Sequence, residues 1–442
     1  MRIFHGIIVF GLIWTTSATP LTFGKFYGDK GKTPTRHPVI LVPGDGGSKM
    51  MAKLNKTSGP HYWCYQHTSF YLLWLNLDVL FSKFMDCFVD NMKLTYNITD
   101  RKTYNTPGVE TVVPGFGTTD TIENLSDWNS IFFSYTQYFY HIVENMVTQL
   151  NYTRNVDVVG APYDFRKAPS ECPGGGEGAP YDFRKAPNEL GVFLANLTRL
   201  TEQVYYRNAN RRVVLVTHSY GCPLTLHWLH SRPQAWKDKF IEQWVSLAGP
   251  FAGTALSYEV YAAGYNLNVW ELSGSRLRQE QRTSPSLAFL SPSPQAWPKD
   301  YVFLSTPETN YTLQNVQQFF TDINYTVGWE MRKDTAGLLD ITQPPGVSMY
   351  CVYGNGSATT ERVVYTDMAK FPDTPDHVVK GAGDGTVNLR SLQWCESWRG
   401  RQRQPLVSRL YPDADHMGMI TKPAMAAEIV NHLAALNGGQ LV

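Results

Sequence analysis

The pattern of apolar and polar positions predicts a sheet of buried strands. Residues 37–42 (HPVILV) form an apolar run that ends in the glycine-rich turn PGDGG. A second apolar run, at 213–217, leads directly into residues 220–230, where apolar side chains recur at helical spacing. Short unbroken apolar runs are typical of strands covered on both faces, as in a parallel sheet.

The same pattern continues along the rest of the chain. Further strands are expected near residues 156–159, 243–247, 349–353 and 407–411. Residues 423–436 have the pattern of a closing helix. Because strands that alternate with helices build a mainly parallel sheet with helices on both faces, we expect an α/β fold with one core over residues 34–442.

Two segments fit this core poorly and are interpreted as insertions. Residues 69–90 are strongly apolar but interrupted by Asn, Asp and Lys, so they form either an amphipathic hairpin in a membrane interface or a buried helix pair. We assign residues 64–105 to this insertion. Residues 255–346 are rich in Trp, Tyr and Pro and lack strand–helix alternation, which indicates an inserted cap or lid.

One decamer occurs twice. Residues 160–169 (GAPYDFRKAP) recur identically at 178–187 after a glycine-rich spacer. Two units do not make a repeat architecture, which needs at least three units to bury a core. The segment 160–187 therefore reflects either a recent duplication or an error in predicting the coding sequence, and only one copy can occupy the ancestral position.

Composition and charge narrow the class of protein. Hydrophobic residues make up 43% of the chain and charged residues 17%, a balance that fills a large core and argues against disorder. The net charge of +1, with no basic block, argues against a nucleic-acid partner. At acid pH the 11 His and part of the 38 carboxylates take up protons, which favours binding to anionic membranes. The aromatic content of 13% suits either lipid contact or a generously packed core.

The N-terminus has the pattern of a signal peptide over residues 1–18, with an apolar run at 6–14 followed by small residues. That run is about half the roughly 20 residues that span a bilayer, so a retained anchor is the weaker alternative. Entry into the secretory pathway agrees with eight glycosylation sequons. Their asparagines are Asn55, Asn97, Asn124, Asn151, Asn196, Asn310, Asn324 and Asn355.

The six cysteines suit an oxidising compartment. The intervals from Cys64 to Cys87 and from Cys351 to Cys395 have ordinary lengths for disulfide loops, although the residues alone leave the connectivity open. Neither spacing resembles a zinc site, and we expect no metal or other cofactor.

The candidate nucleophile is Ser219, in the segment VVLVTHSYG at 213–221. A strand that turns sharply into a helix exposes the serine at the turn above the sheet, and Gly221 permits the close crossing of helix and strand. Thr217 stands where the G-x-S-x-G pattern has its first glycine. The serine hydroxyl needs a neighbouring base, because it is a weak nucleophile at its own pKa.

The candidate base is His416, which follows the last predicted strand and precedes the last helix. His218 is a poor alternative, because consecutive side chains diverge and its ring points into the core. Asp384, on the glycine-rich turn GAGDGTV, supplies an acid to orient the imidazole. Taken singly, Asp384 is equally a turn former and His416 a surface histidine, but together with Ser219 they follow the chain order of an α/β-hydrolase triad.

An oxyanion hole needs two backbone N–H groups. We expect one from Tyr220, directly after the nucleophile, and one from Asp45 in the loop after the first strand.

With these residues in view, the chain resembles the family of lysosomal phospholipase A2 and lecithin:cholesterol acyltransferase, and is nearer to its lysosomal branch. The matching segments are 39–47 (VILVPGDGG), 74–77 (WLNL), 113–117 (VPGFG), 160–166 (GAPYDFR), 218–221 (HSYG), 234–239 (QAWKDK), 245–253 (VSLAGPFAG) and 383–388 (GDGTVN). They extend over nearly all of the chain after the signal peptide.

The resemblance implies an α/β-hydrolase that cleaves a fatty acyl chain from glycerophospholipids without calcium and passes it to water or to a lipophilic alcohol such as ceramide. It implies the triad and oxyanion hole given above, and the disulfides Cys64–Cys87 and Cys351–Cys395. It also implies that the first insertion binds membranes. The implied insertion residues are Trp74, Leu75 and Leu77.

The implied partners are a phospholipid surface and a lipid acyl acceptor, and the implied location is the lysosome or the extracellular space, peripheral on membranes. Two alternatives stay open. One is an extracellular cholesterol-esterifying enzyme of the lecithin:cholesterol acyltransferase type. The other is a lipid-binding homologue that keeps the fold but has lost the chemistry.

Overall fold

The computed structural model describes residues 36–80, 83–127, 136–167, 190–267 and 272–438, and every structural statement below concerns these residues. The predicted signal peptide at 1–18 and the second decamer copy at 178–187 lie outside them.

A six-stranded parallel sheet forms the centre of the fold, with the strand order β15-β12-β9-β8-β1-β7. The strands are β1 (Val39–Val42), β7 (Val158–Gly160), β8 (Val213–His218), β9 (Ile241–Leu247), β12 (Met349–Gly354) and β15 (Leu406–Tyr411). Each strand lies at an expected position. The inner strands are mainly apolar and buried because both faces are covered, whereas the edge strand β15 carries Ser408 and Arg409 and is largely exposed. The predicted α/β class is confirmed.

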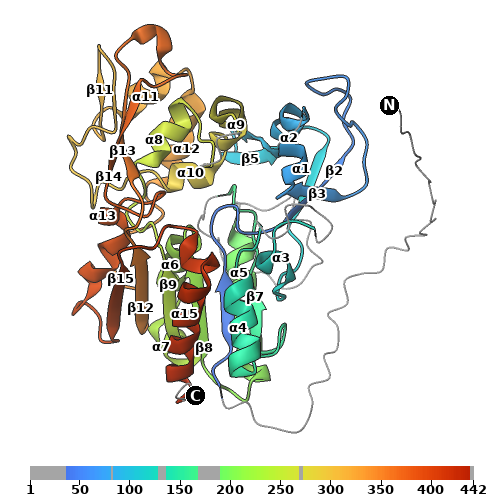
Figure 1. Ribbon diagram of the computed structural model, residues 1–442, viewed down its shortest axis with the longest axis vertical. Coiled ribbons are helices and arrows are strands. Elements are labelled where there is room, and N and C mark those ends of the chain that lie inside the picture. Colours follow the sequence, from blue (N-terminus) through green and yellow to red (C-terminus); the bar gives the residue numbers. More distant parts are fainter. Residues whose placement is uncertain (1–35, 81–82, 128–135, 168–189, 268–271, 439–442) are drawn as a thin grey trace, which may run out of the picture. The chain divides into compact units, whose positions relative to one another are not determined.

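Helices cover this sheet, and α4 and α15 lie side by side (Figure 1). The helices of this part are α3 (Asp120–Glu123), α4 (Tyr140–Leu150), α5 (Gly191–Arg207), α6 (Gly221–His230), α7 (Gln234–Phe240), α13 (Leu389–Leu392), α14 (Gly418–Thr421) and α15 (Pro423–Leu436). The 3-10 helix η4 (Gln393–Trp398) follows α13. The expected helices at 220–230 and 423–436 are α6 and α15. None of the described helices is long and apolar enough to cross a membrane.

The first insertion and the strands on either side of it form two small antiparallel sheets and contain two short helices. The elements within residues 64–105 are β3 (Tyr71–Trp74), α1 (Leu77–Leu80), α2 (Met85–Met92), β4 (Leu94–Asn97) and β5 (Lys102–Asn105), and the flanking strands are β2 (Met50–Leu54) and β6 (Val109–Val112). Most side chains of α2 are buried, and a disulfide ties Cys87 on α2 to Cys64 in the preceding loop. That loop carries exposed aromatic side chains, with Tyr62 94% and Tyr65 70% exposed.

The region predicted as a cap has a hydrophobic cluster of its own, which includes Tyr258, Phe303 and Phe319. Its elements are α8 (Leu256–Ala262), α9 (Gly274–Gln281), α10 (Pro285–Phe289), β10 (Leu304–Ser305), β11 (Asn310–Tyr311), α11 (Val316–Asp322) and α12 (Thr326–Thr335). Later residues complete its sheet. They form β13 (Thr359–Val364), η3 (Met368–Lys370) and β14 (His377–Gly381), so the cluster extends beyond residue 346.

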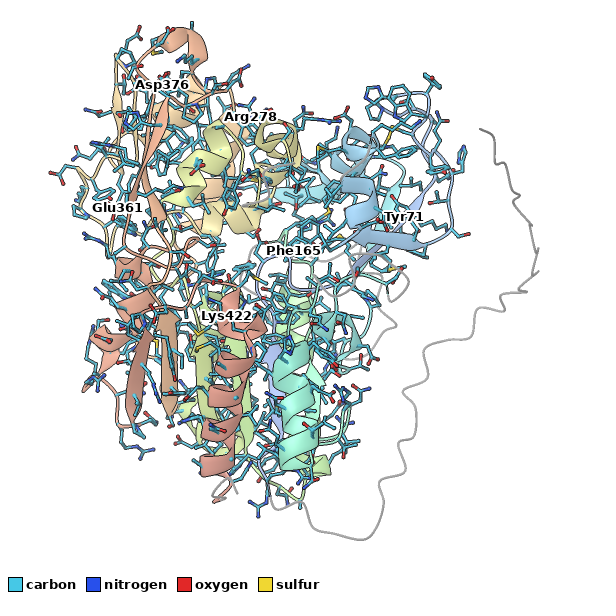
Figure 2. All side chains as sticks on the ribbon, viewed as in Figure 1. Tyr71, Phe165, Arg278, Glu361, Asp376 and Lys422 are labelled. Atoms are coloured by element: carbon cyan, nitrogen blue, oxygen red, sulfur yellow. A yellow bond between two sulfur atoms is a disulfide. The ribbon has the colours of Figure 1, made fainter. Side chains whose placement is uncertain are left out.

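Phe165 lies where the sheet, the first insertion and the cap meet (Figure 2). Its ring is 5.5 Å from that of Trp74 on β3. The next residue, Arg166, accepts a backbone hydrogen bond from Ser286 on α10. The first decamer copy therefore occupies the junction of the three parts.

Candidate active site

Ser219 lies on a strained turn between β8 and α6. Its φ is +53°, a left-handed conformation that a residue with a side chain adopts only at a cost. The turn is crowded, since a Cβ on Gly221 would lie 2.4 Å from the carbonyl oxygen of Pro43, and one on Gly44 would lie 2.6 Å from Cβ of Ser219. Glycine at these two positions lets the loop after β1 pass directly against the nucleophile turn.

The side chains of Ser219, His416 and Asp384 are brought together. Nε2 of His416 is 2.9 Å from Oγ of Ser219, and Nδ1 is 2.7 Å from Oδ2 of Asp384. All three residues are buried, and Asp384 is only 1% exposed. In this arrangement one imidazole nitrogen can take the serine proton while the carboxylate fixes the ring and stabilises its charged form.

The turn around Asp384 holds its carboxylate in place. The backbone N–H groups of Thr386 and Val387 donate to Oδ1 at 3.1 and 2.8 Å. The backbone N–H of His416 donates to the carbonyl oxygen of Asp384 at 2.8 Å. Because Oδ1 is held by the backbone, Oδ2 is left to accept from the imidazole.

A second hydrogen-bonded chain lies beneath the nucleophile. The Gly44 N–H donates to the hydroxyl of Tyr138 at 2.9 Å, and that hydroxyl donates to Nδ1 of His218 at 2.5 Å. Nε2 of His218 then donates to the backbone oxygen of His416 at 3.1 Å. Burial lowers the pKa of His218 well below its ordinary value, with a further contribution from His416, so its ring is neutral. As predicted, His218 points into the core. Tyr138 was missed, because a lone tyrosine far from the motif gives no signal in the sequence.

Asp45 and Tyr220 border the same site. Tyr220 is the N-terminal cap of α6, and Asp45 is in the loop directly after Gly44. Asp45 is exposed to solvent, yet many protein atoms surround its carboxyl. This desolvation raises the pKa of its carboxyl to about 7, with a smaller contribution from the charge of Asp164. The oxyanion-hole role of the backbone N–H groups of Asp45 and Tyr220 stays a prediction.

A second carboxyl with a raised pKa lies on the cap side. Glu280 on α9 is 8% exposed, and burial raises its pKa to about 8, with a further contribution from the charge of Asp45. Arg166 opposes this shift but is itself paired with Asp164 at 2.7 Å. Sequence reasoning missed Glu280, because nothing in the helix pattern of α9 distinguishes this glutamate from a solvated one.

The first decamer copy supports the loop that carries Asp45. The Tyr163 hydroxyl donates to the Pro43 carbonyl at 2.9 Å, and the Tyr220 hydroxyl donates to the Lys167 carbonyl at 2.6 Å. Arg166, 1% exposed, also donates to the Met92 carbonyl at 2.9 Å. These bonds join the nucleophile turn to the first insertion.

The three residues predicted to insert into a membrane are half-buried. Trp74, Leu75 and Leu77 pack against the main core. The Trp74 indole donates to the backbone oxygen of Gly46 at 2.7 Å, next to Asp45. Trp74 therefore contacts the cleft loop, and the exposed aromatic surface of this insertion lies at Tyr62, Tyr65 and Phe70.

The predicted disulfide residues are paired as Cys64–Cys87 and Cys351–Cys395. The thiol of Cys222, next to the nucleophile turn, is buried, and this burial raises its pKa to about 11. The sequon asparagines differ in exposure. Exposed are Asn55, Asn97, Asn151, Asn310 and Asn324, and half-buried are Asn124, Asn196 and Asn355.

The chain is similar to known proteins over most of its length. The family model for lecithin:cholesterol acyltransferase matches residues 70–173 and 177–423. The chain is 40% identical over 394 residues to the lysosomal phospholipase A and acyltransferase of Homo sapiens, which covers 89% of each chain. It is 36% identical over 389 residues to the phosphatidylcholine-sterol acyltransferase of Gallus gallus, covering 88% of each.

Proposed function

The chain belongs to the lecithin:cholesterol acyltransferase family, and we propose that it takes a fatty acyl chain from a glycerophospholipid and passes it to water or to a lipophilic alcohol such as ceramide. The observation that carries this proposal is the His416 imidazole, which bridges Ser219 and Asp384. The name of the human relative joins phospholipase A and acyltransferase activity, which supports one intermediate common to both.

In the first half-reaction Ser219 is the nucleophile. Nε2 of His416 accepts the Oγ proton while Oγ attacks the ester carbon, and the positive charge on the ring is stabilised by Asp384. The tetrahedral intermediate then collapses, His416 gives the proton to the departing glycerol oxygen, and an acyl-enzyme and a lysophospholipid result. The backbone N–H groups of Asp45 and Tyr220 would receive the negative charge on the carbonyl oxygen.

In the second half-reaction His416 acts as base again. It takes a proton from water or from an alcohol, whose oxygen attacks the acyl-enzyme, and then returns the proton to Ser219. Water gives a free fatty acid and an alcohol gives a new ester. The reaction requires no metal ion, because the imidazole and the oxyanion hole supply all its proton transfers and charge stabilisation.

We propose further that the first insertion docks on the membrane through the loop from Tyr62 to Phe70. Aromatic side chains favour the interface between lipid and water, and those of Tyr62 and Tyr65 are exposed. A short helix pair under the loop and the Cys64–Cys87 disulfide fix its base. The sequence features and the relatives favour a secretory-pathway protein, in the lysosome or outside the cell, peripheral on membranes.

The test compares the glycosylated protein with Ser219→Ala on phosphatidylcholine vesicles that contain ceramide, at about pH 4.5 and about pH 7.4 with a calcium chelator. Free fatty acid and acylated ceramide are measured. We expect both products from the natural protein and a loss of about 10³-fold or more with Ser219→Ala. Equal product from the two proteins would overturn the proposal. Vesicles with cholesterol in place of ceramide test the cholesterol-esterifying alternative, which requires a cholesteryl ester as the main product.

A further inference from the structure

A buried arginine in the cap has no counter-ion among the residues that the structure describes. Arg332 on α12 is 9% exposed. Its guanidinium donates from Nη1 to the Ala288 carbonyl at 3.1 Å and from Nη2 to the Pro292 carbonyl at 2.9 Å. These bonds satisfy two of the five N–H donors but leave the positive charge unpaired. A buried charge without a partner destabilises the folded state, so we expect a negative group to bind at this site.

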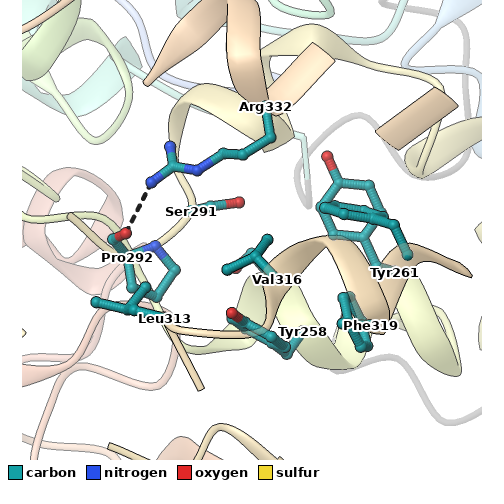
Figure 3. A pocket seen from close by; sticks show the side chains of 10 residues that line it. Tyr258, Tyr261, Ser291, Pro292, Leu313, Val316, Phe319 and Arg332 are labelled. Carbon is teal, nitrogen blue, oxygen red and sulfur yellow. Dashed lines mark hydrogen bonds between the residues drawn. The ribbon is translucent and has the colours of Figure 1, made fainter. Parts of the chain in front are cut away.

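The guanidinium borders a cavity (Figure 3). The cavity leaves about 10 Å³ for the centre of a water-sized sphere, which is the room that one water molecule or one monatomic ion needs. Its lower wall is apolar, with Leu313, Val316 and Phe319. This small volume favours a monatomic ion over phosphate, sulfate or a carboxylate.

A second unsatisfied donor faces the same cavity. The hydroxyl of Tyr261 is buried and has no hydrogen-bond partner among the described residues. The two serine hydroxyls on the wall are already committed, since Ser257 donates to the Thr254 carbonyl at 2.9 Å and Ser291 to the Leu287 carbonyl at 3.1 Å. The cavity therefore offers a cationic donor and a neutral donor, and the charge of Arg332 favours an anion over a neutral molecule.

We propose that a monatomic anion, chloride under physiological conditions, binds in this cavity between the guanidinium of Arg332 and the hydroxyl of Tyr261. The ion accepts from both donors and neutralises the buried charge. It joins α8, which carries Tyr261, to α12 and to the end of α10. Because Phe289 on α10 packs against Tyr220 with ring centroids 5.9 Å apart, the ion also stabilises the cap against the nucleophile turn.

The first test measures thermal unfolding of the full glycosylated protein in chloride and in gluconate, at one pH and one ionic strength. An anion that binds only the folded state raises the Tm, and we expect a saturable rise of about 2 °C in chloride and in bromide. Tyr261→Phe removes one donor and keeps the cavity, so it should weaken the chloride dependence several-fold. Tyr365→Phe is the matched control, because that buried hydroxyl donates to the Pro372 carbonyl at 2.7 Å, away from the cavity.

The second test is crystallographic and needs no variant. A crystal grown in bromide should give an anomalous difference peak between Arg332 and Tyr261. Identical Tm values in chloride and gluconate, or a bromide crystal with a water molecule and no anomalous signal in the cavity, would overturn the proposal. Equal chloride dependence in Tyr261→Phe and in the natural protein would also exclude this site as its origin.

Discussion

The hydroxyl of Tyr138 lies 2.5 Å from Nδ1 of His218, and this contact links two loops of the site that are far apart in sequence. The same hydroxyl accepts a hydrogen bond from the Gly44 N–H, and Nε2 of His218 donates to the backbone oxygen of His416. The loop before Asp45 and the loop of the base are thus positioned by one buried chain of hydrogen bonds. Its members touch neither the scissile ester nor the leaving group.

Tyr138→Phe should therefore lower kcat about 10-fold and change KM little, because the catalytic groups remain but are held less firmly. The variant leaves the Gly44 N–H and Nδ1 of His218 without partners. The measurement is steady-state hydrolysis of a soluble ester. Tyr152→Phe is the control, since its buried hydroxyl donates to the His37 carbonyl at 2.7 Å, away from the site. An equal loss in both variants would mean that Tyr138 acts only through stability.

Activity should fall as the pH rises through the pKa of Asp45. This pKa is raised to about 7, so the carboxyl is neutral in acid and becomes negative above neutrality, where its charge opposes the developing oxyanion. Asp45→Asn keeps a neutral group at every pH. We expect the ratio of activity at about pH 7.4 to that at about pH 4.5 to rise threefold or more.

The control for this profile is Asp127→Asn, which removes an exposed carboxylate with 55% of its side chain accessible. Its pH profile should match that of the natural protein. If Asp45→Asn also leaves the profile unchanged, a group other than Asp45 limits activity at neutral pH.

Glu280 should make the protein less stable as the pH rises. Its folded pKa of about 8 lies above the ordinary value of 4.5, so the folded state holds a proton that the unfolded state releases between these values. The contribution of Glu280 to the free energy of unfolding is fully present at low pH and is lost as the pH rises to about 8. Glu280→Gln should raise the Tm by about 2 to 5 °C at pH 8 and have little effect near pH 4.5. Glu308→Gln, at an exposed position, should change neither value.

The exposed aromatic loop should control binding to membranes but not the chemistry. The double variant Tyr62→Ser, Tyr65→Ser should lower vesicle binding in a sedimentation assay about 10-fold, because each ring loses interfacial burial. Hydrolysis of a soluble ester should be unchanged. Tyr206→Ser, at a 57% exposed position on α5, is the matched control. Equal vesicle binding by all three proteins would remove the loop from the proposed membrane contact.

The sheet and the order of the triad could be predicted from the sequence because both rest on local signals. Apolar runs mark most strands of the central sheet, and the segment around Ser219 is a strand, turn and helix within a few residues. The positions of Asp384 and His416 follow from loops at the ends of strands.

The supporting residues could not be predicted, because they act through contacts between distant segments. Tyr138 is 80 residues from His218 in sequence. The family resemblance implied Trp74 as a membrane-insertion residue, and that role stays a prediction; nothing in the sequence indicated that its indole N–H donates to the Gly46 carbonyl. Apolar periodicity predicts that a side chain will be buried, but it does not predict which residues will bury it.

The close approach of Gly44 to Ser219 limits how this enzyme can be re-engineered. Neither Gly44 nor Gly221 has space for a larger side chain, so both positions should resist natural and engineered substitution. The residues of α9 and of the first insertion lie elsewhere in the sequence and pack through side chains. Selection for new acyl chains or new alcohol acceptors should therefore accumulate changes in these segments while Gly44 and Gly221 stay constant.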